Sequence, residues 1–213
     1  MKPLIHIVDD DKAMRKSLCW LIESVGLETK SYSSAKEFIQ NYNDERLGCL
    51  LLDIRMPGIS GLDLQESLNK LNTLIPIIFL TGHGDVPIAV RAFKSGAFDF
   101  LQKPCNDQIL LDRINDAIEF HQRKLLEQNE LESVKERISS LTKREYEVAE
   151  CVSHGLQNKE IAKKLGISPK TVEVYRHNAL SKMKASSMAE LTRLWILEEK
   201  WTIGNEAQTS LPK

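Results

Sequence analysis

The sequence predicts a doubly wound α/β domain with a parallel sheet, followed by a small all-α domain. Over the first 120 residues, four short apolar runs and a weaker fifth run alternate with helical patterns, whereas only helical patterns follow residue 141. The charge also divides: residues 1–120 carry 13 Lys and Arg against 17 Asp and Glu, and residues 121–213 carry 16 against 13. Parts of opposite charge are expected to meet different partners, and the basic part suits either nucleic acid or a solvated surface.

The composition is typical of a globular chain, with 42% hydrophobic and 28% charged residues among 213. No apolar run approaches the roughly 20 residues that cross a bilayer, and the N-terminus lacks the features of a signal peptide. We therefore expect a cytoplasmic protein with no membrane partner. The cysteines are far apart and form no CxxC pair, which predicts reduced thiols. They are Cys19, Cys49, Cys105 and Cys151.

Runs such as residues 49–54 lack polar alternation, as expected of strands that helices cover on both faces. Four of the five predicted strands are such apolar runs, and the second is weaker. Their limits are residues 4–8, 27–32, 49–54, 76–80 and 98–102. Helical patterns follow each strand, and Gly26 and Gly96 stand where two of these helices should end. The predicted helices span 12–25, 34–42, 61–71 and 86–95, with a fifth that begins near Asn106. Right-handed crossovers then place helices on both faces of one sheet.

The fifth helix has no Gly or Pro from Asn106 to about Ser140, so we predict one long helix that becomes a linker. Its last turns carry a short apolar seam, which is too short for a coiled coil of at least about three heptads. A solvated connecting helix is the alternative. The predicted division is a first domain at 1–121, a helical linker at 122–140, a helical domain at 141–200 and a flexible tail at 201–213.

The helical domain shows strong helix-start signals. "TKRE" at 142–145 is a capping box, in which Thr142 caps the helix and Glu145 reaches back to it. A second helix covers 158–166 and ends at Gly166. A third covers 168–183, with Ser168 as its N-cap and Pro169 at its first helical position. A fourth covers 187–197.

Five polar residues follow strands of the predicted sheet, at the edge where doubly wound domains bind ligands. Asp9 and Asp10 follow the first strand, Asp53 ends the third, Thr81 follows the fourth and Lys103 the fifth. Converging carboxylates require a cation, and oxygen ligands with open positions favour Mg²⁺. No glycine-rich phosphate loop is present. The set suits phosphoryl transfer onto a carboxylate, with Asp53 as the acceptor.

Long ordered motifs carry a resemblance to a known family. They are "IVDDD", "LLLDIRMPGISGLDL", "FLTGHGDVPIAVRAFKSGAFDFLQKP" and "LTKREYEVAECVSHGLQNKEIAKKLGISPKTVEVYRHNALSKM". Over about residues 3–198 the chain resembles two-component response regulators of the NarL/FixJ family. The resemblance implies a flavodoxin-like receiver with strand order 2-1-3-4-5 and a LuxR-type helix-turn-helix domain of four helices. It also implies a transcription factor rather than an enzyme, apart from Mg²⁺-dependent phosphorylation and dephosphorylation of the receiver itself.

The resemblance assigns roles in the receiver. Asp53 matches the phospho-acceptor, and Asp9, Asp10 and the backbone carbonyl of Arg55 match further Mg²⁺ ligands. Lys103 matches the lysine that pairs with the phosphoryl group, while Thr81 and Phe100 match the switch pair. A sensor histidine kinase would supply the phosphoryl group and the receiver would then form a homodimer. The interface candidates are Val90, Lys94 and Asp99. Cys105 departs from the family pattern, which has Phe there.

The third helix of the second domain is expected to enter the major groove of promoter DNA. Glu173 suits a cytosine amino group and Val174 a thymine methyl, although core packing is the alternative for Val174. Tyr175 stands where the family has His, so the base preference is expected to differ. A change at the promoter would then alter the activity of RNA polymerase. The candidate DNA contacts are Asn158, Lys159, Lys170, Thr171, Glu173, Val174, Arg176, His177 and Lys182.

Two rival functions stay open at this point. An aspartyl-phosphate phosphohydrolase would carry a second Asp two residues beyond the nucleophile, where this chain has Arg55. A constitutive DNA-binding dimer with an unused acidic site is the other alternative, against which stands the presence of all five rim residues.

Overall fold

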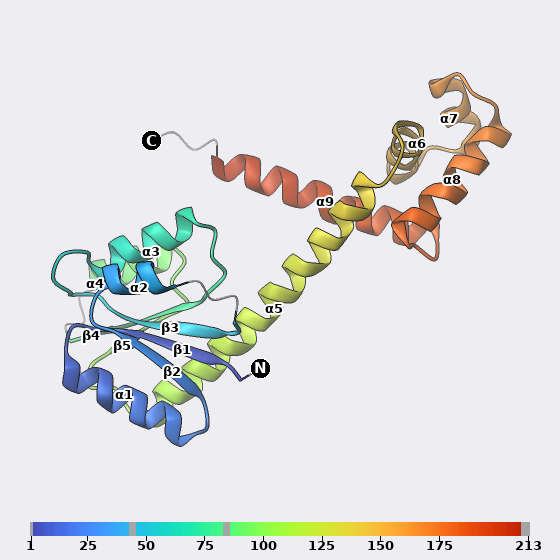
Figure 1. Ribbon diagram of the computed structural model, residues 1–213. Helices are drawn as coiled ribbons and strands as arrows, with labels where there is room; N and C mark the ends of the chain where they lie inside the picture. The colour runs from blue at the N-terminus through green and yellow to red at the C-terminus, as the bar shows by residue number, and fades with distance from the viewer. Residues whose placement is uncertain (1, 43–45, 83–85, 210–213) are drawn as a thin grey trace. The chain divides into compact units, whose positions relative to one another are not determined.

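The computed structural model describes residues 2–42, 46–82 and 86–209 of the chain. These residues form two compact units, with the boundary between Leu125 and Leu126 (Figure 1). Each unit has a hydrophobic core of its own. Among the described residues, no helix combines the length and the apolar character that crossing a membrane requires.

The first unit is built on a five-stranded sheet in the order β2-β1-β3-β4-β5, in which every neighbouring pair is parallel. This confirms the predicted fold and strand order. Gly48, which pairs with Leu4, lies so close to the carbonyl oxygen of Leu4 that a Cβ atom would be 1.8 Å from it. The strands are β1 (Leu4–Val8), β2 (Glu28–Tyr32), β3 (Gly48–Asp53), β4 (Ile77–Thr81) and β5 (Asp99–Gln102).

Helices cover both faces of this sheet (Figure 1). They are α1 (Lys12–Ser24), α2 (Ala35–Asn41), α3 (Gly61–Lys70), α4 (Val86–Lys94) and the first part of α5 (Asp107–Ser139). One core cluster joins α1 and α5 to the sheet through residues such as Ile22 and Ile114, and the other joins α2, α3 and α4 through residues such as Phe38 and Leu64. Asp11 caps α1, because its carboxylate accepts from the backbone N–H groups of Ala13 and Met14.

The second unit is all helical, with the start signals that the sequence predicts. Thr142 and Glu145 form the capping box of α6, and Ser168 caps α8, which has Pro169 in its first turn. Gly166 ends α7 in the left-handed region, with φ of 66°. The helices are α6 (Lys143–Ser153), α7 (Asn158–Leu165), α8 (Pro169–Met183) and α9 (Met188–Thr209).

The last part of α5 belongs to the second unit. Val134 is 1% exposed within the core of that unit, and Ile138 and Leu141 pack against the same core. The apolar seam is therefore neither a coiled-coil face nor the side of a solvated helix. A spacing of three and four residues marks any amphipathic helix with a partner, and the sequence pattern alone does not identify that partner.

Helix α9 is longer than the predicted span of 187–197. It continues to Thr209, so residues 201–209 are helical where the sequence suggests a flexible tail. No proline lies between Met188 and Pro212, so every residue of this span keeps the backbone donor that the helical hydrogen-bond ladder uses. Residues 210–213 lie outside the described part of the chain.

Candidate functional site

The ends of three strands bring an ammonium group between two carboxylates. Asp9 directly follows β1, Asp53 is the last residue of β3, and Lys103 directly follows β5. The Nζ atom of Lys103 lies 2.6 Å from Oδ2 of Asp9 and 2.7 Å from Oδ1 of Asp53. Both carboxylates are nearly buried, with Asp9 2% and Asp53 8% exposed. Residues that are 94 and 50 positions apart in the sequence thus meet at one rim of the sheet.

Backbone groups hold the second oxygen of each carboxylate. The N–H of Asp11 donates to Oδ1 of Asp9 at 2.8 Å, and the N–H of Arg55 donates to Oδ2 of Asp53 at 2.9 Å. The Arg15 guanidinium donates to the backbone carbonyl of Asp9 at 2.6 Å. These bonds fix the orientation of both carboxylates before any ligand arrives, which is the arrangement that reduces the cost of reorganisation during reaction.

The electrostatics of the site reflect one cation shared by two anions. Burial raises the pKa of the Asp53 carboxyl, and this outweighs the opposing hydrogen bond and charge of Lys103, while the charge of Asp9 raises that pKa further. Burial works to lower the pKa of Lys103, but the hydrogen bonds and charges of Asp53 and Asp9 outweigh it and raise that pKa. The negative charge of the two carboxylates at this rim is therefore larger than the positive charge of the one ammonium group.

That excess suits a further cation. Asp9 and Asp53 offer carboxylate oxygens, the donors that Mg²⁺ prefers, and Mg²⁺ keeps several waters in place of protein ligands. Asp10, the third predicted ligand side chain, is exposed next to Asp9. Within the residues that the structure describes, no group of three or more His, Cys, Asp or Glu side chains is arranged around a common metal position. The donor set fits Mg²⁺ only with water and backbone oxygens to complete its coordination.

The predicted switch residues lie beside this rim. Thr81 is the last residue of β4 and is buried, and its carbonyl accepts from the backbone N–H of Lys103 at 2.6 Å. Phe100, on β5, is half-buried, with its ring centre 6.5 Å from that of Phe79. The structure thus places Thr81 next to Lys103 and places Phe100 at the edge of the core that α4 covers.

The predicted interface residues lie on or beside α4. Val90 and Lys94 are exposed, and Asp99 is half-buried with Oδ2 at 3.5 Å from Nε of Arg113. Val86 and Phe93 are 72% and 49% exposed on the same helix as Val90. Apolar residues at positions 86, 90 and 93 follow helical spacing, so they lie on one side of α4.

The exposed side of α8 carries four of the predicted DNA contacts: Lys170, Glu173, Val174 and His177. Val174 is 53% exposed, so core packing, the alternative for this residue, is excluded. Val172 is the buried valine of this helix. Lys159 is exposed near the start of α7, and Thr171 is half-buried with its hydroxyl 2.7 Å from that of Ser168.

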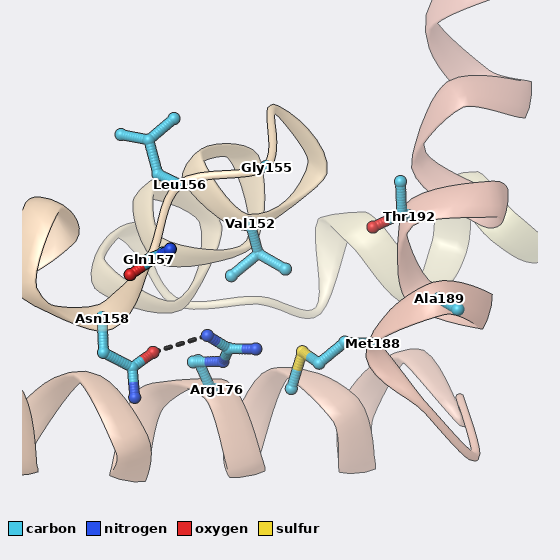
Figure 2. A pocket seen from close by; sticks show the side chains of 9 residues that line it. All are labelled: Val152, Gly155, Leu156, Gln157, Asn158, Arg176, Met188, Ala189 and Thr192. Carbon is cyan, nitrogen blue, oxygen red and sulfur yellow. Dashed lines mark hydrogen bonds between the residues drawn. The ribbon is translucent and has the colours of Figure 1, made fainter.

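Three other predicted contacts are engaged within the unit. Arg176 shares a face of α8 with buried Val172 and Ala179, and its Nη1 donates to Oδ1 of Asn158 at 2.5 Å. Figure 2 shows this pair in a pocket of about 440 Å³ that also includes Met188.

Lys182 donates to Oε2 of Glu145 at 2.6 Å. This bond and the capping bonds to Thr142 hold the pKa of buried Glu145 low, at about 2. The sequence analysis gave Arg176 and Lys182 only as candidate DNA contacts, because the partners Asn158 and Glu145 are 18 and 37 residues away along the chain.

Comparison with known proteins identifies both units. Residues 5–115 match the model of the response regulator receiver domain, and residues 139–195 match that of the luxR family of bacterial regulatory proteins. The chain belongs to the response regulator family. Its receiver implies a histidine kinase as partner, and its LuxR-type domain implies DNA as ligand. This response regulator is a phosphorylation-activated transcriptional regulator.

Relatives of this response regulator match it over most of their length. Nodulation protein W of Bradyrhizobium diazoefficiens is 45% identical, over 91% of this chain and 85% of that protein. Transcriptional regulatory protein FixJ of Azorhizobium caulinodans is 45% identical, over 91% and 92%. Among solved structures, the response regulator StyR is 42% identical with a TM-score of 0.80, over 91% and 98%. Full-length FixJ from B. japonicum is 40% identical with a TM-score of 0.58, over 94% and 98%.

Proposed function

We propose that this response regulator accepts a phosphoryl group on Asp53 from a histidine kinase and then binds promoter DNA as a homodimer. The observation that supports the acceptor is the position of the Lys103 ammonium group between Asp9 and Asp53, at 2.6 and 2.7 Å. A carboxylate oxygen of Asp53 would attack phosphorus, form a P–O bond and release the kinase imidazole as the P–N bond breaks. Lys103 would then pair with the phosphoryl oxygens.

The ligands proposed for Mg²⁺ are the carboxylates of Asp9, Asp10 and Asp53 and the backbone carbonyl of Arg55. Bound there, the ion would neutralise charge that develops on the phosphoryl oxygens. The chain's own catalysis is limited to its phosphorylation and dephosphorylation. Asp9 would orient the ligands, and Lys103 would exchange its bond to Asp53 for a bond to the phosphoryl group.

The proposed switch begins when the Thr81 hydroxyl turns to the phosphoryl group and Phe100 turns inward. A phosphoryl group brings about −1.5 to −2 charges, which is enough to bias a packed face between two arrangements. The homodimer would then form through α4 and β5, with Val90, Lys94 and Asp99 in the interface. Changed promoter binding would alter the activity of RNA polymerase in the cytoplasm, where a bacterial promoter lies.

The DNA-binding residues are proposed in two groups. Exposed side chains of α8 would read bases, with Glu173 and Val174 in the groove. Lys159, Lys170, Thr171 and His177 would contact the backbone or neighbouring bases. Asn158, Arg176 and Lys182 each make a bond within the unit and keep further N–H donors, with which they would contact phosphates. We also propose that the DNA-binding domain begins before residue 141, because α5 contributes Val134 to its core.

The two rival functions find less support. A phosphohydrolase would need an acid at position 55, and Arg55 there is exposed and contacts Asp53 through its backbone N–H alone among the bonds described. A constitutive dimer would not use the buried carboxylates of Asp9 and Asp53. Burying two charges costs free energy, and no function would then compensate for that cost.

The test is Asp53→Asn in the full chain, treated with acetyl phosphate and Mg²⁺. We expect the unaltered chain to gain one phosphoryl group and to shift from monomer to dimer in light scattering, and the variant to do neither. Asp112→Asn is the matched control, because Asp112 is exposed on α5 and bonds only to Gln108 among the partners described. Phosphorylation of the Asn variant would refute the acceptor, and a dimer without phosphodonor would favour the constitutive alternative.

A further inference from the structure

The C-terminal end of α8, the helix that presents residues to DNA, is bonded to the linker helix. Arg137, in the last turn of α5, donates from Nη1 to the backbone carbonyl of Met183 at 3.2 Å. Its Nη2 lies 3.1 Å from Oγ of Ser133, one turn earlier on α5, which holds the guanidinium in place. Met183 is the last residue of α8, so Arg137 satisfies one of the carbonyl groups that a helix end leaves without an intrahelical partner.

The end of α8 is a place where such a bond has an effect. Lys184 follows it with φ of 51°, in the left-handed region that is strained for a residue other than glycine. The backbone N–H of Lys184 bonds back to Leu180 and Ser181. A cation at this position also opposes the partial negative charge at a helix C-terminus. Arg137 therefore stabilises a turn that is intrinsically strained.

Further contacts make this part of α5 a component of the DNA-binding unit. Val134 is buried in its core, and Arg193 of α9 lies 3.5 Å from Glu130 of α5. Glu190, at the start of α9, bonds to Ser186 and lies in the field of Arg193 and Arg137, and these interactions lower its pKa in that order. The guanidinium thus lies where α5, the end of α8 and the start of α9 meet.

The C-terminal end of α8 is also bonded to α6, because Lys182 lies 2.6 Å from Glu145 of that helix. The exposed residues of α8 lie toward its other end, from Lys170 to His177. Thirteen residues separate Lys170 from Met183, which is about 20 Å of rigid helix. A small rotation at the Met183 end therefore displaces the side chains that face DNA.

We propose that Arg137 is a positioning residue for DNA recognition, which sets the orientation of α8 through the carbonyl of Met183. Because α5 is also the last helix of the receiver, the same bond connects the helix that leaves the receiver to the helix that reads DNA. Neither statement depends on Asp53 as the acceptor. A measurement without phosphodonor therefore tests this proposal separately from the proposed phosphorylation.

The test compares Arg137→Met, which keeps the length of the stem and removes every donor, with Arg137→Lys, which keeps a charged donor. The probes are a duplex that the unaltered full chain selects from a random library and a scrambled duplex of equal length. We expect Arg137→Met to weaken the affinity for the selected duplex about tenfold, which is the effect of one lost charge-assisted bond. The affinity for the scrambled duplex should change less than twofold. Arg137→Lys should recover most of the loss.

Arg123→Ala is the control, because Arg123 is an exposed residue of the same helix and its removal changes the net charge equally. It should leave both affinities within twofold. Equal weakening of both duplexes by Arg137→Met would show a charge effect and overturn the proposal. So would unchanged binding, a failure of Arg137→Lys to recover it, or a Met variant that is unfolded at the temperature of the binding assay.

Discussion

At the scale of single residues, the receiver uses buried polar groups whose partners come from distant strands. Lys103 bonds to two carboxylates. His121, near the end of the receiver part of α5, bonds to the backbone at the start of β3. Nδ1 of His121 lies 3.1 Å from the backbone N and 2.9 Å from the backbone O of Gly48. Gly48 has no space for a side chain, because a Cβ atom would lie 1.8 Å from the carbonyl oxygen of Leu4.

We predict that His121 makes the stability of the receiver depend on pH. Burial lowers the pKa of His121, and the bond to Gly48 offsets this only in part. Below an unfolded-state pKa of about 6.5, the unfolded chain binds more protons than the folded chain, so the free energy of unfolding decreases as the pH falls through that value. Calorimetry at pH 7.5 and pH 5.5 measures this loss for the receiver transition.

His121→Gln should show a smaller loss between the two pH values than the unaltered chain. His154→Gln is the control, because His154 is exposed in the other unit. An equal loss in the unaltered chain and in His121→Gln would refute the prediction, since buried His6, in the same unit, would then account for all of it.

At the scale of elements, α8 separates its functions by face. One side carries Val172, Ala179 and Met183 into the core, and the opposite side carries exposed charged residues. Arg176 lies on the inner side, where it bonds to Asn158 and links α8 to the start of α7. The angle between these two helices determines how far α8 can enter a groove, so we expect the bond between Arg176 and Asn158 to affect DNA recognition.

Lys170→Ala is expected to weaken DNA binding uniformly across sequences. Lys170 is exposed in the first turn of α8, where we expect it to contact a phosphate. The slope of log K against log salt concentration should become shallower by about one unit, the contribution of one released counterion. Binding titrations at several salt concentrations, with Lys70→Ala of the receiver as control, measure the change. A loss of discrimination at one base pair would instead mean that Lys170 reads a base.

At the scale of the whole molecule, the chain contains separate cores that share one helix. The receiver core consists of two clusters on either side of the sheet, and the second unit has a cluster of its own. Helix α5 contributes Ile114 to the first unit and Val134 to the second. Separate cores predict separate cooperative transitions, because each unit loses its own packed interior when it unfolds.

Core substitutions should therefore act on one transition each. Leu52→Ala in β3 and Ile161→Ala in α7 remove fully buried side chains, and each is expected to cost about 2 to 5 kcal/mol. For units of this size, that corresponds to a decrease of roughly 10 °C or more in Tm. Scanning calorimetry of the full chain should show Leu52→Ala lowering one transition and Ile161→Ala the other. A single transition lowered by both variants would contradict the division.

The sequence by itself predicted the alternation of strands and helices, the caps of α6 and α8, and the rim on which Asp9, Asp53 and Lys103 meet. These features depend on local patterns, and the carboxyl ends of parallel strands always share one edge. The family resemblance supplied the strand order and the roles of single residues.

Some side chains could bond to any of several partners, and only the tertiary structure decided which partner each one has. The seam of α5 packs on the second unit, Arg176 bonds to Asn158, Lys182 bonds to Glu145, and Arg137 reaches Met183. A long cationic side chain reaches several ångströms in many directions, so its position in the sequence does not determine its partner. The folded chain selects that partner, because burying a polar group without one costs more free energy than any single bond contributes.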